Sequence, residues 1–151
     1  MRSSSGASGG ALVGCIGDGT ANYLQFNNVS GTTAGSHRLT VYYASGESRS
    51  LTVSVNGAAA TTLATPSTGG WDTVGSVATT VTLTSGANTV GIGDPTGWAP
   101  DIDRIVVSDP LVLRGDERVP HRHRRPDRSS PAQGARSRWA SRPAGVAAPE
   151  R

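Results

Sequence analysis

The feature that most constrains this chain is a two-residue alternation of apolar and polar side chains, repeated in short segments across residues 12–107. Within residues 37–44, the side chains of Leu39, Val41 and Tyr43 fall on one face and the residues between them fall on the other. Successive side chains of a β-strand point to opposite faces, so this period is that of a half-buried strand. The segment therefore predicts a strand with one face in a core.

Further segments repeat this alternation, with turn residues between them. Their expected inward-facing residues are Leu24, Phe26, Leu51, Val53, Val55, Val81, Leu83, Val90, Ile92, Ile105 and Val107. Asn56-Gly57 is a preferred pair for a type I′ hairpin turn and predicts a returning strand over residues 59–63. About eight short strands at roughly ten-residue spacing, with no helical pattern between them, predict an antiparallel β-sandwich or barrel.

The charge divides the chain into a body and a tail. All 14 basic residues are arginines, and ten of them lie in residues 109–151 together with five of the 11 acids. This tail also holds six of the nine prolines and has almost no apolar periodicity, so we expect it to be disordered. A basic tail that binds nucleic acid or anionic lipid is the alternative. We expect no nucleic-acid partner, because Trp139 is the only aromatic residue of the tail and bases need aromatic platforms.

The sequence contains no recognisable catalytic or metal-binding motif. His37 begins a predicted strand beside Arg38, where a solvent-facing side chain is expected rather than a general base. Cys15 has no histidine or cation near it in the sequence, so we expect a small buried or rim residue rather than a reactive thiol. His121 and His123 lie in the arginine-rich tail without a third ligand. We therefore expect no enzymatic activity.

Three acidic residues lie close together near the end of the body. Asp101 and Asp103 are two residues apart on one predicted strand and are expected to project from the same face, with Asp94 shortly before them. Glycoside hydrolysis needs two carboxyl groups on opposite sides of the scissile bond. This spacing favours the binding of an ion or a hydroxyl group over catalysis.

Two tryptophans occupy predicted loops rich in Gly, Pro and Asp. Trp71 follows two glycines, and Trp98 follows a glycine and lies two residues before a proline. An exposed indole offers a flat apolar face that matches the C–H face of a sugar ring, and neighbouring Asp or Asn side chains can hydrogen-bond its hydroxyl groups. Trp98 is thus a candidate ligand contact, whereas Trp71 is either a ligand contact or a plug at one end of the core. Tyr23 is expected either on the outer sheet or at the cleft.

Seven short motifs follow one another in the body. They are Val13–Gly17, Asn22–Phe26, Gly35–Ala44, Val55–Gly57, Gly69–Trp71, Leu83–Asn88 and Asp101–Ile105. In order and spacing, over about residues 7–107, they resemble the carbohydrate-binding modules of family 35 and their relatives in family 6. Members of these families are β-sandwich appendages of secreted glycoside hydrolases, bind sugars in a loop cleft and often hold a structural calcium ion.

The resemblance implies a carbohydrate-binding site at Trp98, Asp101, Trp71 and Asn22, with Asp101 where many relatives have asparagine. Asp103 matches an acid that helps to hold calcium in relatives. Those relatives begin with an extra strand whose Glu-Ala-Glu type motif supplies other calcium ligands, and this chain starts after it. The resemblance therefore implies a structural calcium site that is incomplete here.

These observations predict an all-β protein, an antiparallel, jelly-roll-like β-sandwich over residues 7–108 with its first strand missing, followed by a disordered tail over residues 109–151. We expect a monomeric, non-catalytic carbohydrate-binding module that binds a polysaccharide or oligosaccharide and has no membrane partner. Its parent is expected to be an extracellular glycoside hydrolase, although Met1–Gly6 contains no apolar signal segment. The alternative is a structural or protein-interaction sandwich without sugar affinity, in which Trp71 and Trp98 serve packing.

Overall fold

The computed structural model describes residues 1–109, which form strands and loops. Its nine strands are β1 (Arg2–Ser3), β2 (Ala11–Leu12), β3 (Leu24–Gly31), β4 (Gly35–Ser45), β5 (Arg49–Val55), β6 (Thr61–Thr65), β7 (Gly70–Leu83), β8 (Gly86–Gly93) and β9 (Asp101–Ser108). Within these residues, no helix is long and apolar enough to cross a membrane. The tail expected to be disordered lies, from residue 110 onward, outside the described part of the chain.

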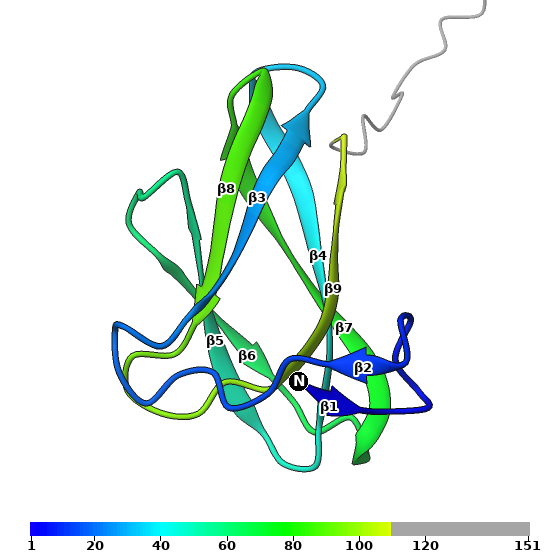
Figure 1. The fold of residues 1–151 in the computed structure, drawn as a ribbon. Helices are drawn as coiled ribbons and strands as arrows, with labels where there is room; N and C mark the ends of the chain where they lie inside the picture. Colours follow the sequence, from blue (N-terminus) through cyan, green and yellow to red (C-terminus); the bar gives the residue numbers. More distant parts are fainter. Residues whose placement is uncertain (110–151) are drawn as a thin grey trace, which may run out of the picture. The chain divides into compact units, whose positions relative to one another are not determined.

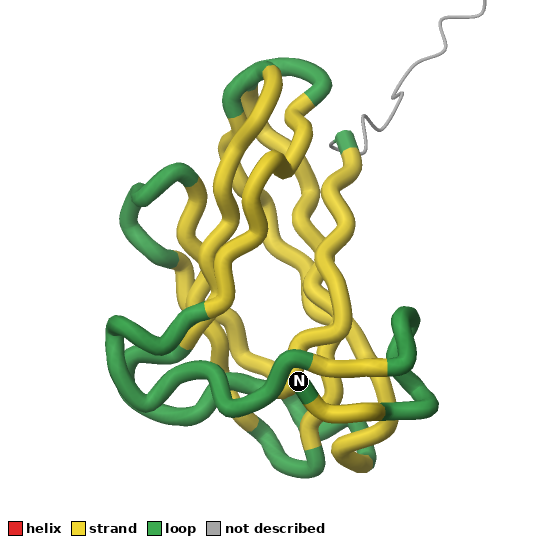
Figure 2. Tube along the Cα trace, in the orientation of Figure 1, coloured by secondary structure: helices red, strands yellow, loops and turns green. Residues whose placement is uncertain are grey.

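Two antiparallel sheets form a sandwich, as predicted (Figure 1). One sheet has the strand order β3-β8-β5-β6 and the other has the order β7-β4-β9. The short strands β1 and β2 pair with each other, and Val13 makes a bridge from the end of β2 to Ile102 in β9. Most of the long loops gather at the lower end of the sandwich (Figure 2), which makes this end the place to look for a binding site.

The core confirms the alternation on which the strand predictions rest. In β4, Leu39, Val41 and Tyr43 are buried, and Leu51 and Val53 are buried in the opposite sheet. The other fully or largely buried apolar residues are Leu12, Ile16, Ala44, Val81, Leu83, Val90, Ile92, Ala99 and Ile102. Burial of this apolar surface between the sheets is the main favourable contribution to folding.

Several local expectations were wrong. His37 was expected to face solvent, but it is 1% exposed, and its Nε2 lies 2.8 Å from the carbonyl oxygen of Thr33. Asn56 and Gly57 do have the positive φ angles of a type I′ turn, but they belong to a longer loop, and the returning strand begins at Thr61. His37 occupies an inward-facing position of β4, two residues before Leu39. The two-residue alternation therefore includes His37, and the prediction of exposure was wrong because it rested on the polarity of histidine.

Residues 1–6 belong to the same compact unit as the sandwich. Arg2 makes ion pairs with Asp72 and Asp101, which lie on β7 and β9. The backbone of Gly6 passes so close to the carbonyl oxygen of Asp72 that a Cβ at Gly6 would collide with it. The N-terminal segment is therefore packed against two strands of the sandwich.

Candidate functional site

A cleft of about 510 Å³ is lined by six side chains from five separate parts of the chain. They are Arg2, Cys15, Arg49, Trp71, Trp98 and Asp101. Three of the four predicted site residues, Trp71, Trp98 and Asp101, thus line one cleft. Trp71 and Asp101 lie at the beginnings of β7 and β9, and Trp98 lies in the loop before β9.

Backbone hydrogen bonds hold the loop that carries Trp98. Asp18 donates to the carbonyl oxygen of Gly97 over 2.7 Å, and Ala99 donates to that of Ile16 over 2.9 Å. At Gly17 a Cβ would lie 2.3 Å from the carbonyl oxygen of Gly97, so only glycine permits this close approach. Trp98 itself is 47% exposed. Its backbone is therefore fixed while its indole remains accessible.

Trp71 lies in the cleft wall and is not a plug of the core. It is 37% exposed, and the guanidinium carbon of Arg49 lies 4.5 Å from the centre of its ring. Gly46 approaches the same ring, since a Cβ there would come within 2.5 Å of the indole Nε1. Arg49 in turn donates to Glu47 over 2.9 and 2.7 Å and to the carbonyl oxygen of Ala99 over 2.9 Å. These contacts fix the orientation of the Trp71 ring.

Asp101 lies beside Arg2 and is only 8% exposed. The Nε and Nη2 atoms of Arg2 donate to Asp101 Oδ2 over 3.0 and 2.9 Å. Nη1 donates to Asp72 over 2.9 Å, and Nη2 also donates to the carbonyl oxygen of Trp71. The hydrogen bond to Asp101, followed in size by the one to Asp72, raises the pKa of Arg2 above its ordinary value, so the guanidinium stays protonated.

Asn22, the fourth predicted contact, does not line this cleft. Its side-chain amide donates to the carbonyl oxygens of Cys15 and Gly17, each over 2.9 Å. Cys15 has a φ of 58° and is exposed at the cleft, outside any strand. In the structure, Asn22 thus stabilises, through these two hydrogen bonds, the loop that carries Cys15.

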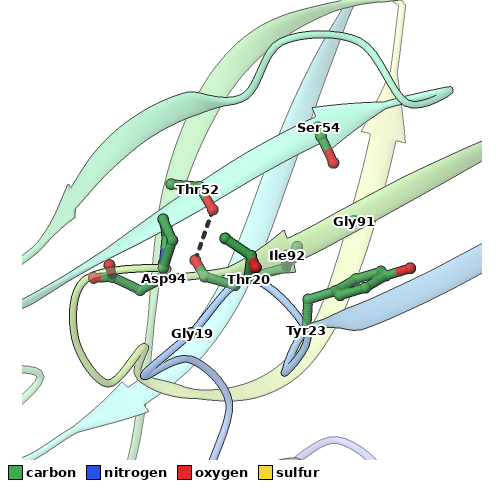
Figure 3. A pocket seen from close by; sticks show the side chains of 10 residues that line it. Gly19, Thr20, Tyr23, Thr52, Ser54, Gly91, Ile92 and Asp94 are labelled. Carbon is green, nitrogen blue, oxygen red and sulfur yellow. Dashed lines mark hydrogen bonds between the residues drawn. The ribbon is translucent and has the colours of Figure 1, made fainter.

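Tyr23 lies on the outer face of the β3-β8-β5-β6 sheet, in a second hollow of about 240 Å³. Figure 3 shows its ring beside Gly91, with the hydroxyl groups of Thr52 and Ser54 across the hollow. Thr52 donates to the carbonyl oxygen of Gly93 over 2.9 Å. Of the two positions expected for Tyr23, the structure therefore shows the outer sheet and not the cleft that Trp71 and Trp98 line.

Asp94 holds together the loop between the hollow and the cleft. Its carboxylate accepts from Ser50 over 2.6 Å and from the backbone and hydroxyl group of Thr96 over 3.0 and 2.9 Å. Burial opposes ionisation of Asp94, but these hydrogen bonds outweigh it and hold the pKa of the carboxyl group below its ordinary value.

The carboxylate of Asp103 is already engaged within the protein. One oxygen accepts from the backbone and hydroxyl group of Ser8 over 2.9 and 2.8 Å, and the other accepts from Arg104 over 2.9 Å. Within residues 1–109, no three His, Cys, Asp or Glu side chains gather where they could hold a metal ion. Calcium takes six to eight oxygen ligands, so the surroundings of Asp103 do not fit this ion.

A register shift separates Asp101 from Asp103. In the pairing of β4 with β9, Tyr42 is opposite Arg104 and Tyr43 is opposite Ile102, which leaves Asp103 as an extra residue. The expected two-residue spacing on a regular strand is therefore broken here. Asp101 pairs with Arg2 at the cleft, and Asp103 has the separate partners described above.

Sequence reasoning missed Arg2 and Arg49 as components of the cleft. No local pattern marks Arg2, since its partner Asp101 is 99 residues away along the chain. Arg49 begins a strand that the alternation of Leu51 and Val53 does predict, but nothing in that pattern indicates contact with Trp71.

Comparison with known proteins identifies the family. The family model described as carbohydrate binding module (family 6) matches residues 2–109. A family 35 carbohydrate-binding module from Clostridium thermocellum is 37% identical, with 71% of this chain and 84% of that chain covered and a TM-score of 0.69. A CBM35 structure from Paenibacillus barcinonensis is 26% identical, with 73% and 87% covered and a TM-score of 0.66.

An exo-β-1,3-galactanase from Phanerochaete chrysosporium, solved with galactose, is 39% identical, with 70% of this chain and 25% of that chain covered and a TM-score of 0.65. No curated protein sequence matches the chain. The family match covers nearly all of the described residues, and the fold and the order of motifs agree with it. The chain therefore belongs to the family 6 carbohydrate-binding modules, in their family 35-like form.

Proposed function

We propose that this module binds a neutral polysaccharide in the cleft between Trp71 and Trp98, with β-1,3-linked galactan as the ligand class. The observation that carries the proposal is the half-exposed indole of Trp98 in one cleft with the carboxylate of Asp101. An indole stacks on the C–H face of a sugar, and a carboxylate accepts hydrogen bonds from its hydroxyl groups. Asn22 supports this site by holding the loop that carries Cys15.

The charges of the cleft favour a neutral sugar over an acidic one. Arg2 is paired with Asp72 and Asp101, and Arg49 is paired with Glu47. A uronate would have to compete with these carboxylates for the arginines and would approach the negative charge of Asp101. Like charges at close range disfavour binding, so the paired arginines support selection of uncharged hydroxyl-rich ligands.

The choice of galactan rests on the similarity to the galactanase that was solved with galactose. This chain covers only 25% of that enzyme, and on this basis we also propose that the module is an appendage of a secreted glycoside hydrolase. The module itself supplies binding, which would concentrate its parent on the polysaccharide surface.

Isothermal titration calorimetry of the full chain tests the proposal. We expect β-1,3-galactotriose to bind at one site, and we expect glucuronic acid and β-1,4-linked glucose and xylose trisaccharides to bind more weakly or not at all. Trp98→Ala should weaken binding about tenfold. If no glycan on a broad array binds the folded chain, the alternative of a structural or interaction module without sugar affinity is correct.

A further inference from the structure

Arg2 connects three elements that border the cleft. From its position in β1 it contacts Asp101 at the start of β9, Asp72 in β7 and the carbonyl oxygen of Trp71. Its side chain is 39% exposed and lines the cleft, whereas the side chain of Asp101 is only 11% exposed. A planar guanidinium can satisfy several acceptors in fixed directions at once, which a flexible ammonium group cannot do.

These contacts leave one oxygen of Asp101 for a ligand. Both bonds from Arg2 go to Oδ2. Oδ1 faces the backbone of Gly14, where a Cβ would lie 2.5 Å away, and within residues 1–109 no hydrogen bond to Oδ1 is found. Because Gly14 has no side chain, the carboxylate can lie in this position. The arrangement fixes the direction of Oδ1 and leaves it without a hydrogen-bond donor from residues 1–109, on a residue that lines the cleft.

We propose that Arg2 is a positioning residue for carbohydrate binding, which acts through Asp101 by fixing the carboxylate so that Oδ1 accepts a sugar hydroxyl group. The inference rests on the proposed function of the cleft and extends it to the N-terminal segment. Because Arg2 also holds the carbonyl oxygen of Trp71, the same side chain keeps the acceptor and the aromatic wall at a constant separation. Such preorganisation reduces the ordering cost of binding.

The rest of the N-terminal segment supports this role of Arg2. Ser4 donates its backbone N–H to the carbonyl oxygen of Gly10, and Ser8 donates to Asp103 on β9. The first bond closes the loop between β1 and β2, and the second ties that loop to β9, so the backbone from which Arg2 projects is constrained. Docking of this segment therefore completes the cleft.

The test is calorimetric titration of β-1,3-galactotriose into the full chain and its Arg2→Gln, Arg2→Lys, Asp101→Asn and Arg2→Gln/Asp101→Asn variants. Arg38→Gln is the matched control, because Arg38 is an exposed arginine on β4 that does not line the cleft. The melting temperature of each variant is measured alongside. Loss of one oriented, charge-assisted hydrogen bond should weaken binding about tenfold in Arg2→Gln.

Arg2→Lys should bind with intermediate affinity, because lysine can reach one acceptor but not all three. In the Asp101→Asn background, Arg2→Gln should cause less than about a twofold further loss, since two residues that act as one unit are not additive. A general structural role would lower the melting temperature without this dependence on Asp101. Arg38→Gln should bind like the wild type.

Wild-type affinity in folded Arg2→Gln would overturn the inference, as would losses that multiply independently in the double variant. If Arg2→Gln does not fold, Arg2→Lys decides: reduced affinity supports the role of the guanidinium, and unchanged affinity refutes it. Absence of binding by the wild-type chain to every glycan would instead refute the proposed function of the cleft, and with it this extension.

Discussion

Removal of the Trp98 indole should reduce sugar affinity by an amount that follows from its exposure. Trp98 is 47% exposed. If a large aromatic side chain has about 250 Å² of surface, about 120 Å² of Trp98 is accessible, and a sugar on one ring face would cover about 60 Å². At about 25 cal/mol per Å², this burial contributes about 1.5 kcal/mol, so Trp98→Ala should bind about tenfold more weakly.

Calorimetric titration of β-1,3-galactotriose measures this loss, and differential scanning calorimetry measures the accompanying change in stability. The melting temperature should fall by only a few degrees, because a side chain that remains half-exposed adds little to the core. Val106→Ala is a control, since Val106 is 42% exposed on β9 and does not line the cleft. A large fall in melting temperature with intact affinity would show that Trp98 is a packing residue and would refute the reasoning.

Three further outcomes are expected. Gly46→Ala should weaken sugar binding because its Cβ would collide with the Trp71 ring, whereas Gly9→Ala, with open space around it, should bind normally in the same titration. Ser50→Ala should lower the melting temperature most at neutral pH, because Ser50 donates one of the hydrogen bonds that hold the pKa of Asp94 below its ordinary value. The stabilising contribution of the ionised Asp94 is present above pH about 4 and is lost as the pH falls through the pKa of the folded state. An equal effect of Ser50→Ala from pH 7 to pH 3 would contradict this assignment. Addition of calcium should leave the melting temperature of the chain unchanged, because an ion stabilises only a folded state that binds it, and a clear upward shift would reveal a site not described above.

The strands were predictable because period two is a local property of the sequence. Leu39 and Val41 of β4 face the core of the sandwich, as their spacing predicts, and so do the apolar side chains of β5 and β8. The prediction that His37 is exposed was wrong because, from the local sequence alone, a polar side chain at an inward-facing position is expected to face solvent. Its burial depends on an acceptor at Thr33, supplied by the turn before the strand.

The cleft was predictable only in part, because a loop tryptophan is visible in the sequence but its partners are not. Trp71 and Trp98 were identified from the Gly, Pro and Asp residues around them. Arg2 and Arg49 come to the cleft through the pairing of distant strands, and no periodicity encodes such contacts. The register shift at Asp103 similarly depends on the packing of β9 against β4 rather than on local composition.

The assembly of the cleft from five separate parts of the chain has a practical consequence for handling the protein. Its lining runs from Arg2 to Asp101, so every sheet of the sandwich must be in place before the site exists. Contacts between residues far apart in sequence form late and slowly during folding of β proteins. Under the proposed function, retention on an immobilised galactan column would therefore separate correctly folded molecules from misfolded ones in a single step, and the retained fraction would report the yield of refolding.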